Sequence, residues 1–139
     1  MTFWDSSALV PLVIQESRSA EARRLIKGTT VAASWLARLE VASALTRLWR
    51  ERKSDEAGLA SDLSELDRLA SCWVEVPLRE DLRQQAMRLL RAHALRSLDA
   101  LQLASAWFAA EGRPETLDFI CFDTRLAAAA RHEGFRVTS

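Results

Sequence analysis

Four acidic residues stand where a carboxylate is either a structural cap or part of a reactive site. Two of them, Asp5 and Asp123, end short apolar stretches and precede helix-like segments, in the similar runs Phe3-Trp4-Asp5-Ser6-Ser7 and Phe122-Asp123-Thr124. An aspartate in front of a helix accepts hydrogen bonds from the first backbone N–H groups, so helix capping alone explains each of them. A reactive role requires further acids at the same place.

Asp99 lies on a helix that is otherwise suited to a protein core. The helix is predicted to begin near Ser97, a candidate N-cap, and to stay apolar as far as Ala110. At about 100° per residue, Asp99 shares a face with Leu103 and Ala106. A buried carboxylate is costly unless it meets a cation, hydrogen-bond donors or a metal. The alternative is a half-exposed acid in the first helical turn, favoured by the helix dipole.

Glu40 is the only acid between Ser34 and Arg50, in a long predicted helix. It lies at the border between an apolar and a polar sector, beside the small residues Ala37 and Ala44. Two interpretations follow: an ion pair with a neighbouring arginine on the helix surface, or an acid that a ligand can approach. The predicted apolar surface comprises Trp35, Leu39, Ala42, Leu45, Leu48 and Trp49.

The elements that must position these acids alternate between short apolar strands and helices. Strands are predicted at residues 2–4, 29–33, 73–78, 117–123 and 135–137, and helices at 8–14, 15–27, 34–53, 54–71, 79–95, 97–110 and 125–132. This alternation indicates an α/β fold with a parallel sheet, and a length of 139 residues fits one domain, 1–139. Ligands bind at the carboxyl ends of parallel strands, so the four acids are predicted to meet there.

Composition restricts the partners and the metal. Lys plus Arg and Asp plus Glu are 19 each, so any contact with a polyanion must be local. No signal peptide or membrane span is predicted, and we expect a cytoplasmic protein with no membrane contact. Cys72 and Cys121 are expected to be reduced core residues, and the isolated His93 and His132 do not make a zinc site. Any metal is therefore held by oxygen.

Carboxylates that meet at one edge raise one another's pKa, and a divalent cation relieves this repulsion. Mg²⁺ or Mn²⁺ held by carboxylates is the usual means of hydrolysing a phosphodiester, because the metal lowers the pKa of the attacking water and offsets charge on the phosphate. We therefore predict Asp5, Glu40, Asp99 and Asp123 as catalytic residues and metal ligands.

The segments that carry these acids resemble a PIN-domain ribonuclease of the VapC type, the toxin of a type II toxin–antitoxin pair. The resemblance runs along the whole chain, and its motifs are Phe3–Val10, Leu39–Leu45, Leu98–Ala104 and Phe122–Leu126. It implies a three-layer α/β/α fold around a central, mainly parallel sheet of about five short strands. It also implies a Mg²⁺- or Mn²⁺-dependent endoribonuclease that cleaves RNA, a cognate antitoxin that covers the active-site groove, and a homodimer.

The resemblance extends to accessory positions. Ser7 matches a small hydroxyl residue of the family, which helps to orient the first carboxylate or the water of the metal. Cys121 departs from the family, where a hydroxyl residue often precedes the Phe-Asp pair, and Pro11 stands where a basic residue is common. Arg96 and Arg125 flank two of the acids and are candidates for binding RNA phosphate, with ion pairing to acids as the alternative.

Other functions are less compatible with the sequence. A phosphatase of the haloacid-dehalogenase type needs a second aspartate two residues after the first, where Ser7 stands. A receiver-like phosphoacceptor domain needs a lysine near its last strands, and Lys53 is the last lysine of the chain. Two alternatives remain: a catalytically silent PIN-fold binding module, or a metal-dependent phosphatase of another α/β family.

Overall fold

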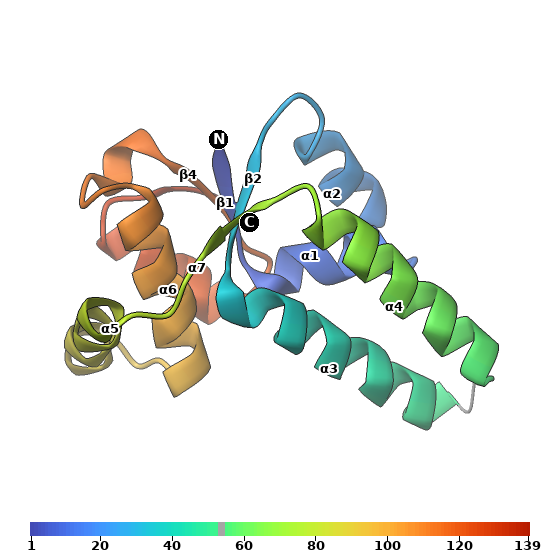
Figure 1. Ribbon diagram of the computed structural model, residues 1–139. Coiled ribbons are helices and arrows are strands. Elements are labelled where there is room, and N and C mark those ends of the chain that lie inside the picture. Colours follow the sequence, from blue (N-terminus) through green and yellow to red (C-terminus); the bar gives the residue numbers. More distant parts are fainter. Residues whose placement is uncertain (53–54) are drawn as a thin grey trace.

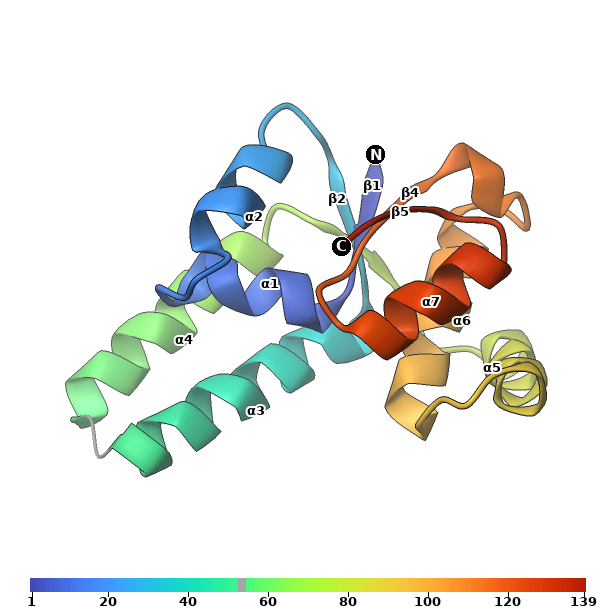
Figure 2. The same cartoon turned by 180° about the vertical axis from the view of Figure 1, so that it is seen from behind.

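The computed structural model describes residues 1–52 and 55–139, and Figures 1 and 2 show it from opposite sides. The elements are β1 (Thr2–Trp4), α1 (Ser6–Val13), α2 (Ser19–Leu25), β2 (Val31–Ser34), α3 (Trp35–Arg52), α4 (Glu56–Ala70), β3 (Val74–Val76), α5 (Glu80–Ala92), α6 (Ser97–Ala109), a 3-10 turn (Pro114–Thr116), β4 (Asp118–Ile120), α7 (Thr124–His132) and β5 (Arg136–Thr138). Within these two ranges, no helix has the length and apolarity needed to cross a membrane.

The five strands form one parallel sheet in the order β3-β2-β1-β4-β5. In the centre, Thr2 of β1 is paired with Val31 of β2 on one side and with Asp118 of β4 on the other. The chain therefore moves outward from β1 in one direction and then returns to add β4 and β5 in the other. This reversal makes the ends of β1 and β4 the point where such sheets bind ligands.

Side chains of the central strands alternate between the two faces of the sheet. Phe3 and Phe119 stack at 5.5 Å between ring centres and belong to a core with α5, α6 and α7. Trp4 and Ile120 belong to a second core with α1, α2, α3 and α4. Because parallel crossovers are right-handed, the reversal of direction after β3 moves the later helices to the opposite face. The predicted α/β/α fold with a parallel sheet is thus confirmed (Figures 1 and 2).

The long predicted helix is present as α3, but the predicted apolar surface is partly wrong. The residues of α3 that are buried are Leu36, Ala37, Val41 and Leu45. Trp35 is 51% exposed and Leu39 is 63% exposed. Helices α1 and α4 pack beside α3, and they cover the stripe that begins at Leu36, so the turn bearing Trp35 and Leu39 lacks a covering layer.

Several element boundaries also differ from the prediction. Arg96, not Ser97, is the N-cap of α6, and it makes no capping hydrogen bond with its side chain. The helix predicted at 15–27 is shorter, because only Ser19–Leu25 is helical. Strand β4 ends at Ile120, before Asp123 is reached. Cys121 is buried as expected, whereas Cys72 is exposed in the turn after α4. The predicted helix ends at residues 53 and 54 lie outside the described residues.

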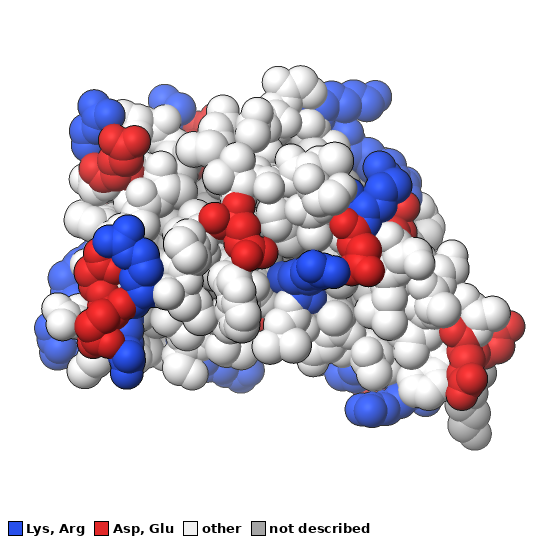
Figure 3. Space-filling model, viewed as in Figure 1, with Lys and Arg blue, Asp and Glu red and all other residues white. Residues whose placement is uncertain are grey.

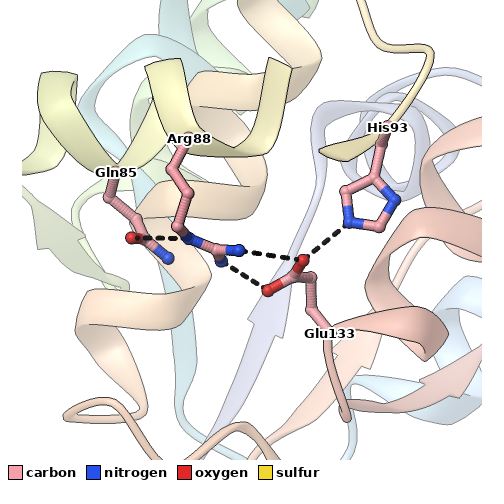
Figure 4. Close-up of polar contacts among 4 residues, drawn as sticks. All are labelled: Gln85, Arg88, His93 and Glu133. Atoms are coloured by element: carbon pink, nitrogen blue, oxygen red, sulfur yellow. Dashed lines mark hydrogen bonds and ion pairs between the residues drawn. The ribbon is translucent and has the colours of Figure 1, made fainter. Parts of the chain in front are cut away.

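A polar cluster joins the ends of α5 and α7 on the face of the sheet that carries Phe3 and Phe119 (Figure 4). Glu133 accepts hydrogen bonds from Arg88 Nη2 at 2.5 Å, and its other oxygen lies 2.6 Å from His93 Nε2. Burial opposes ionisation of Glu133, but its partners Arg88 and His93 outweigh it and leave its pKa lowered. His93 is therefore a hydrogen-bonding residue, and the cluster anchors the chain just before it enters α6.

Candidate active site

Asp5 follows β1 directly and is the N-cap of α1, so the capping role considered for it is observed. Its side chain is buried, with 5% of the residue exposed. Oδ2 accepts hydrogen bonds from the backbone N–H of Ser7 at 3.0 Å and from the Ser7 hydroxyl at 2.5 Å. The capping bond thereby fixes the direction in which this carboxylate points.

Ser7 connects Asp5 with the segment that leads to Asp123. Its Oγ accepts a hydrogen bond from the backbone N–H of Phe122 at 2.9 Å. Cys121 lies beside it, with Sγ 3.7 Å from Asp5 Oδ2 and 3.4 Å from the carbonyl oxygen of Asp123. Burial raises the pKa of the Cys121 thiol, so it stays protonated and acts as a weak donor where the family often has a hydroxyl.

Asp123 is the N-cap of α7 and accepts the backbone N–H of Leu126 at 2.8 Å. Its Oδ1 is thus occupied, while the residue remains exposed to solvent. Asp99 lies in the first turn of α6 and is half-buried. This placement agrees with the alternative of a half-exposed acid in the first helical turn. Both acids therefore stand at helix N-termini at the carboxyl ends of the strands, where partial positive charge favours a carboxylate.

Glu40 lies in the second turn of α3 and does not form the ion pair considered for it. Its Oε1 accepts a hydrogen bond from Gln102 Nε2 at 2.6 Å. Gln102 Nε2 also donates to Ser6 Oγ at 2.7 Å. In the part of the chain that the structure describes, no Lys, Arg or His forms an ion pair with Glu40. Its partner is an amide that extends from α6.

An open groove of about 1240 Å³ brings three of the predicted acids together. Glu40, Asp99 and Asp123 line it, and Asp5 lies directly behind two further lining residues. Those two are Ser6 and Ser7 of α1. The walls therefore come from α1, α3, α6 and the start of α7, which are distant in the sequence.

The acids around this groove influence one another. The pKa values of Asp5, Glu40 and Asp99 are all raised, and burial is the largest cause for each. Repulsion adds to burial: Asp99 raises the pKa of Asp5, both raise that of Glu40, and Asp123 raises that of Asp99. Across residues 1–52 and 55–139, however, no group of three acidic, histidine or cysteine side chains forms a ready-made metal centre.

Positive charge is present in the groove as well. Arg96 and Arg125 both line it, and their charges oppose the rise in the pKa of Asp99. Neither arginine forms an ion pair within the residues described, so the alternative role considered for them is not observed. On the face shown in Figure 3, Lys and Arg lie interspersed with Asp and Glu between wide uncharged areas, in agreement with the absence of net charge.

The residue that sequence reasoning missed is Gln102. It is fully buried, although it belongs to the motif that contains Asp99. A signal was available, because Gln102 is a long polar residue one turn after Asp99 in an otherwise apolar helix. A buried amide needs partners, and this position could have been expected to face a polar site.

Comparison with known proteins gives a consistent set of relatives. The chain matches the PIN domain family over residues 2–132. It is 36% identical to Ribonuclease VapC45 of Mycobacterium tuberculosis over 138 residues, which cover 99% of this chain and 94% of the relative. Two solved structures are similar at a TM-score of 0.71. One is a toxin–antitoxin complex from Klebsiella pneumoniae, 17% identical, with 100% of this chain and 97% of that chain covered. The other is Mycobacterium tuberculosis VapC20, a sarcin-ricin loop cleaving toxin, 22% identical, with 97% and 96% covered.

Proposed function

We propose that this chain, which belongs to the PIN-domain family, is a metal-dependent endoribonuclease that hydrolyses phosphodiester bonds of RNA as the toxin of a toxin–antitoxin pair. Its curated relatives along the full chain carry the name Ribonuclease VapC, which supports an RNA substrate. The observation that carries the proposal is the groove at the ends of β1 and β4, where Glu40, Asp99 and Asp123 face one space above the buried Asp5.

The donor set fits a hard divalent cation such as Mg²⁺ or Mn²⁺ better than it fits a soft, thiolate-bound metal. The acids supply only hard oxygen ligands, and the one thiol beside them, on Cys121, is buried and protonated. Burial and mutual repulsion raise the pKa of Asp5, Glu40 and Asp99. A bound cation would reduce this repulsion between the carboxylates. Because no ready-made centre exists in the described residues, side-chain rotation would complete the ligand set. The bound ion would supply a more acidic water and offset charge on the phosphate.

The other groups of the groove support the same reaction. Ser7 holds one oxygen of Asp5 and leaves the other without a side-chain partner on α1. Arg96 and Arg125 present guanidinium groups, which suit phosphate oxygens, on walls that also carry Asp99 and Asp123. We infer that the arginines bind the backbone of RNA on either side of the phosphate that the acids face. Local charge of this kind is required because the chain has no net charge.

A cognate antitoxin is the partner that we propose for the groove. Leu39 of α3 and Leu98 of α6 line it, and they remain 63% and 46% exposed. Large apolar side chains beside arginines suit a protein segment that buries the leucines and neutralises the arginines. We also propose that the chain forms a homodimer, and analytical ultracentrifugation of the purified protein would test this by measuring its molecular mass in solution.

The test is RNA cleavage by the purified chain without a partner. We expect cleavage with Mn²⁺ or Mg²⁺, loss of cleavage after chelation, and no cleavage by Asp99→Asn. Asp62→Asn is the matched control, because Asp62 is a half-buried acid of α4 that does not line the groove. Equal cleavage by wild type and Asp99→Asn would contradict the proposal. Binding of a partner without any cleavage would instead favour a silent binding module.

A further inference from the structure

Gln102 occupies the junction of three elements that form the groove. It lies in the middle of α6, is fully buried, and stands one turn beyond Asp99. Its Nε2 donates to Glu40 Oε1 of α3 at 2.6 Å and to Ser6 Oγ of α1 at 2.7 Å. One side-chain nitrogen thus ties α1 and α3 to the helix that carries Asp99.

The orientation of this amide serves Glu40. Both hydrogens of Nε2 are used, while Oε1 is buried and has no hydrogen-bond partner within the described residues. A buried acceptor without a donor is unfavourable, so packing alone would be satisfied better by an apolar side chain of similar size. Turning the amide over would give Ser6 an acceptor but would place Oε1 against the Glu40 carboxylate. Only the observed orientation provides both neighbours with a donor.

Glu40 needs such a partner more than the other acids do. Asp5 and Asp123 are held by backbone N–H groups of the helices that they cap. Glu40 lies inside α3, where the backbone N–H groups are already bonded, and its longer side chain has more rotatable bonds. The amide of Gln102 donates to its carboxylate at 2.6 Å, and the Ser6 hydroxyl, which the same amide holds, is the other side chain whose hydrogen bonding lowers the pKa of Glu40.

We propose that Gln102 is a positioning residue that holds the Glu40 carboxylate toward Ser6 and the acids of the groove, so that Glu40 can join them around a divalent cation. This inference rests on the proposed function. Residues that orient metal ligands change metal affinity or activity by about 10- to 100-fold when they are replaced.

A double-mutant cycle on Mn²⁺ binding tests the inference, with calorimetry of the metal alone as the readout. We expect Gln102→Leu to weaken Mn²⁺ binding by about 10-fold or more, and to weaken it no further when Glu40 is already replaced by alanine. Excess Mn²⁺ should restore much of the RNA cleavage of Gln102→Leu. Gln85→Leu is the matched control: Gln85 is a half-buried glutamine of α5 outside the groove, and its Nε2, like Gln102 Oε1, is a buried amide atom without a hydrogen-bond partner among the described residues.

The outcomes separate this inference from the proposed function. Wild-type protein that binds no Mn²⁺ and cleaves no RNA would overturn both. Wild-type binding together with additive effects of Gln102→Leu and Glu40→Ala would overturn only the role of Gln102. Gln102→Met, which is unbranched, repeats the measurement if Gln102→Leu does not fold, as judged by circular dichroism. Failure of both variants to fold would assign Gln102 a purely structural role and would also overturn the inference.

Discussion

Replacing Ser7 by alanine tests whether this hydroxyl holds the corner at which β1 and the segment before Asp123 meet. The Ser7 hydroxyl donates to Asp5 Oδ2 and accepts the backbone N–H of Phe122. Ser7→Ala removes both hydrogen bonds and adds nothing in their place. The capping bond from the Ser7 backbone N–H to Asp5 remains, so the geometry of α1 should persist.

The magnitude follows from these two bonds. A hydrogen bond to a carboxylate contributes about 1.5–3 kcal/mol, and a partly buried N–H left without a partner costs about 1–3 kcal/mol. Because water and small movements of the neighbouring backbone compensate for part of the two lost hydrogen bonds, we expect a loss of about 2–4 kcal/mol in the free energy of unfolding. At about 3 °C per kcal/mol for a chain of this size, the melting temperature should fall by about 6–12 °C.

Thermal and urea unfolding of the metal-free protein measure this change. Ser64→Ala is the matched control, because Ser64 is exposed on α4 and its hydroxyl makes no hydrogen bond with the residues described. The control should stay within about 0.5 kcal/mol of wild type, and Ser7→Thr, which keeps the hydroxyl, should recover much of the loss. If Ser7→Ala melts together with Ser64→Ala, the hydroxyl does not hold this corner and the reasoning is wrong.

Three further predictions concern charge. Burial and then Asp123 raise the pKa of Asp99, so the folded protein binds this proton more tightly than the unfolded chain, and stability falls as pH rises through the raised pKa. Metal-free Asp99→Asn should therefore melt above wild type at neutral pH but not at about pH 3. Glu133 has a lowered pKa, so Glu133→Gln should cost about 1–2 kcal/mol at neutral pH and less as acid protonates the wild-type residue. Mn²⁺ affinity, measured by calorimetry, should rise with pH because Asp5, Glu40 and Asp99 must lose protons. An affinity independent of pH would contradict that ligand set.

Local pattern was sufficient for much of the fold. The apolar runs around Phe3 and Phe119 predicted strands, and their alternation with helices predicted the parallel sheet. The acids at the ends of those runs could be placed because the carboxyl ends of parallel strands share one edge. Asp5 and Asp123 also cap helices, and this capping was predictable from the short motifs themselves.

Long-range packing decided what pattern alone could not. The covering helices determine which stripe of α3 is buried, so the exposure of Trp35 and Leu39 was not predictable from periodicity. The preference of helix N-termini for serine predicted Ser97 as the N-cap of α6, whereas the structure has Arg96 at that position. Such outcomes depend on neighbours that are distant in the sequence.

The sequence by itself determined the acids, the order of strands and helices, and the edge of the sheet at which those acids should meet, because each depends on residue type and on short-range periodicity. Only the tertiary structure decided the partner of Glu40. Gln102 is 62 residues away along the chain, and α6 reaches α3 only because the chain reverses direction after β3 and crosses to the other face of the sheet. The pairing of Ser7 with Phe122 has the same origin, since it spans 115 residues and depends on β4 lying beside β1.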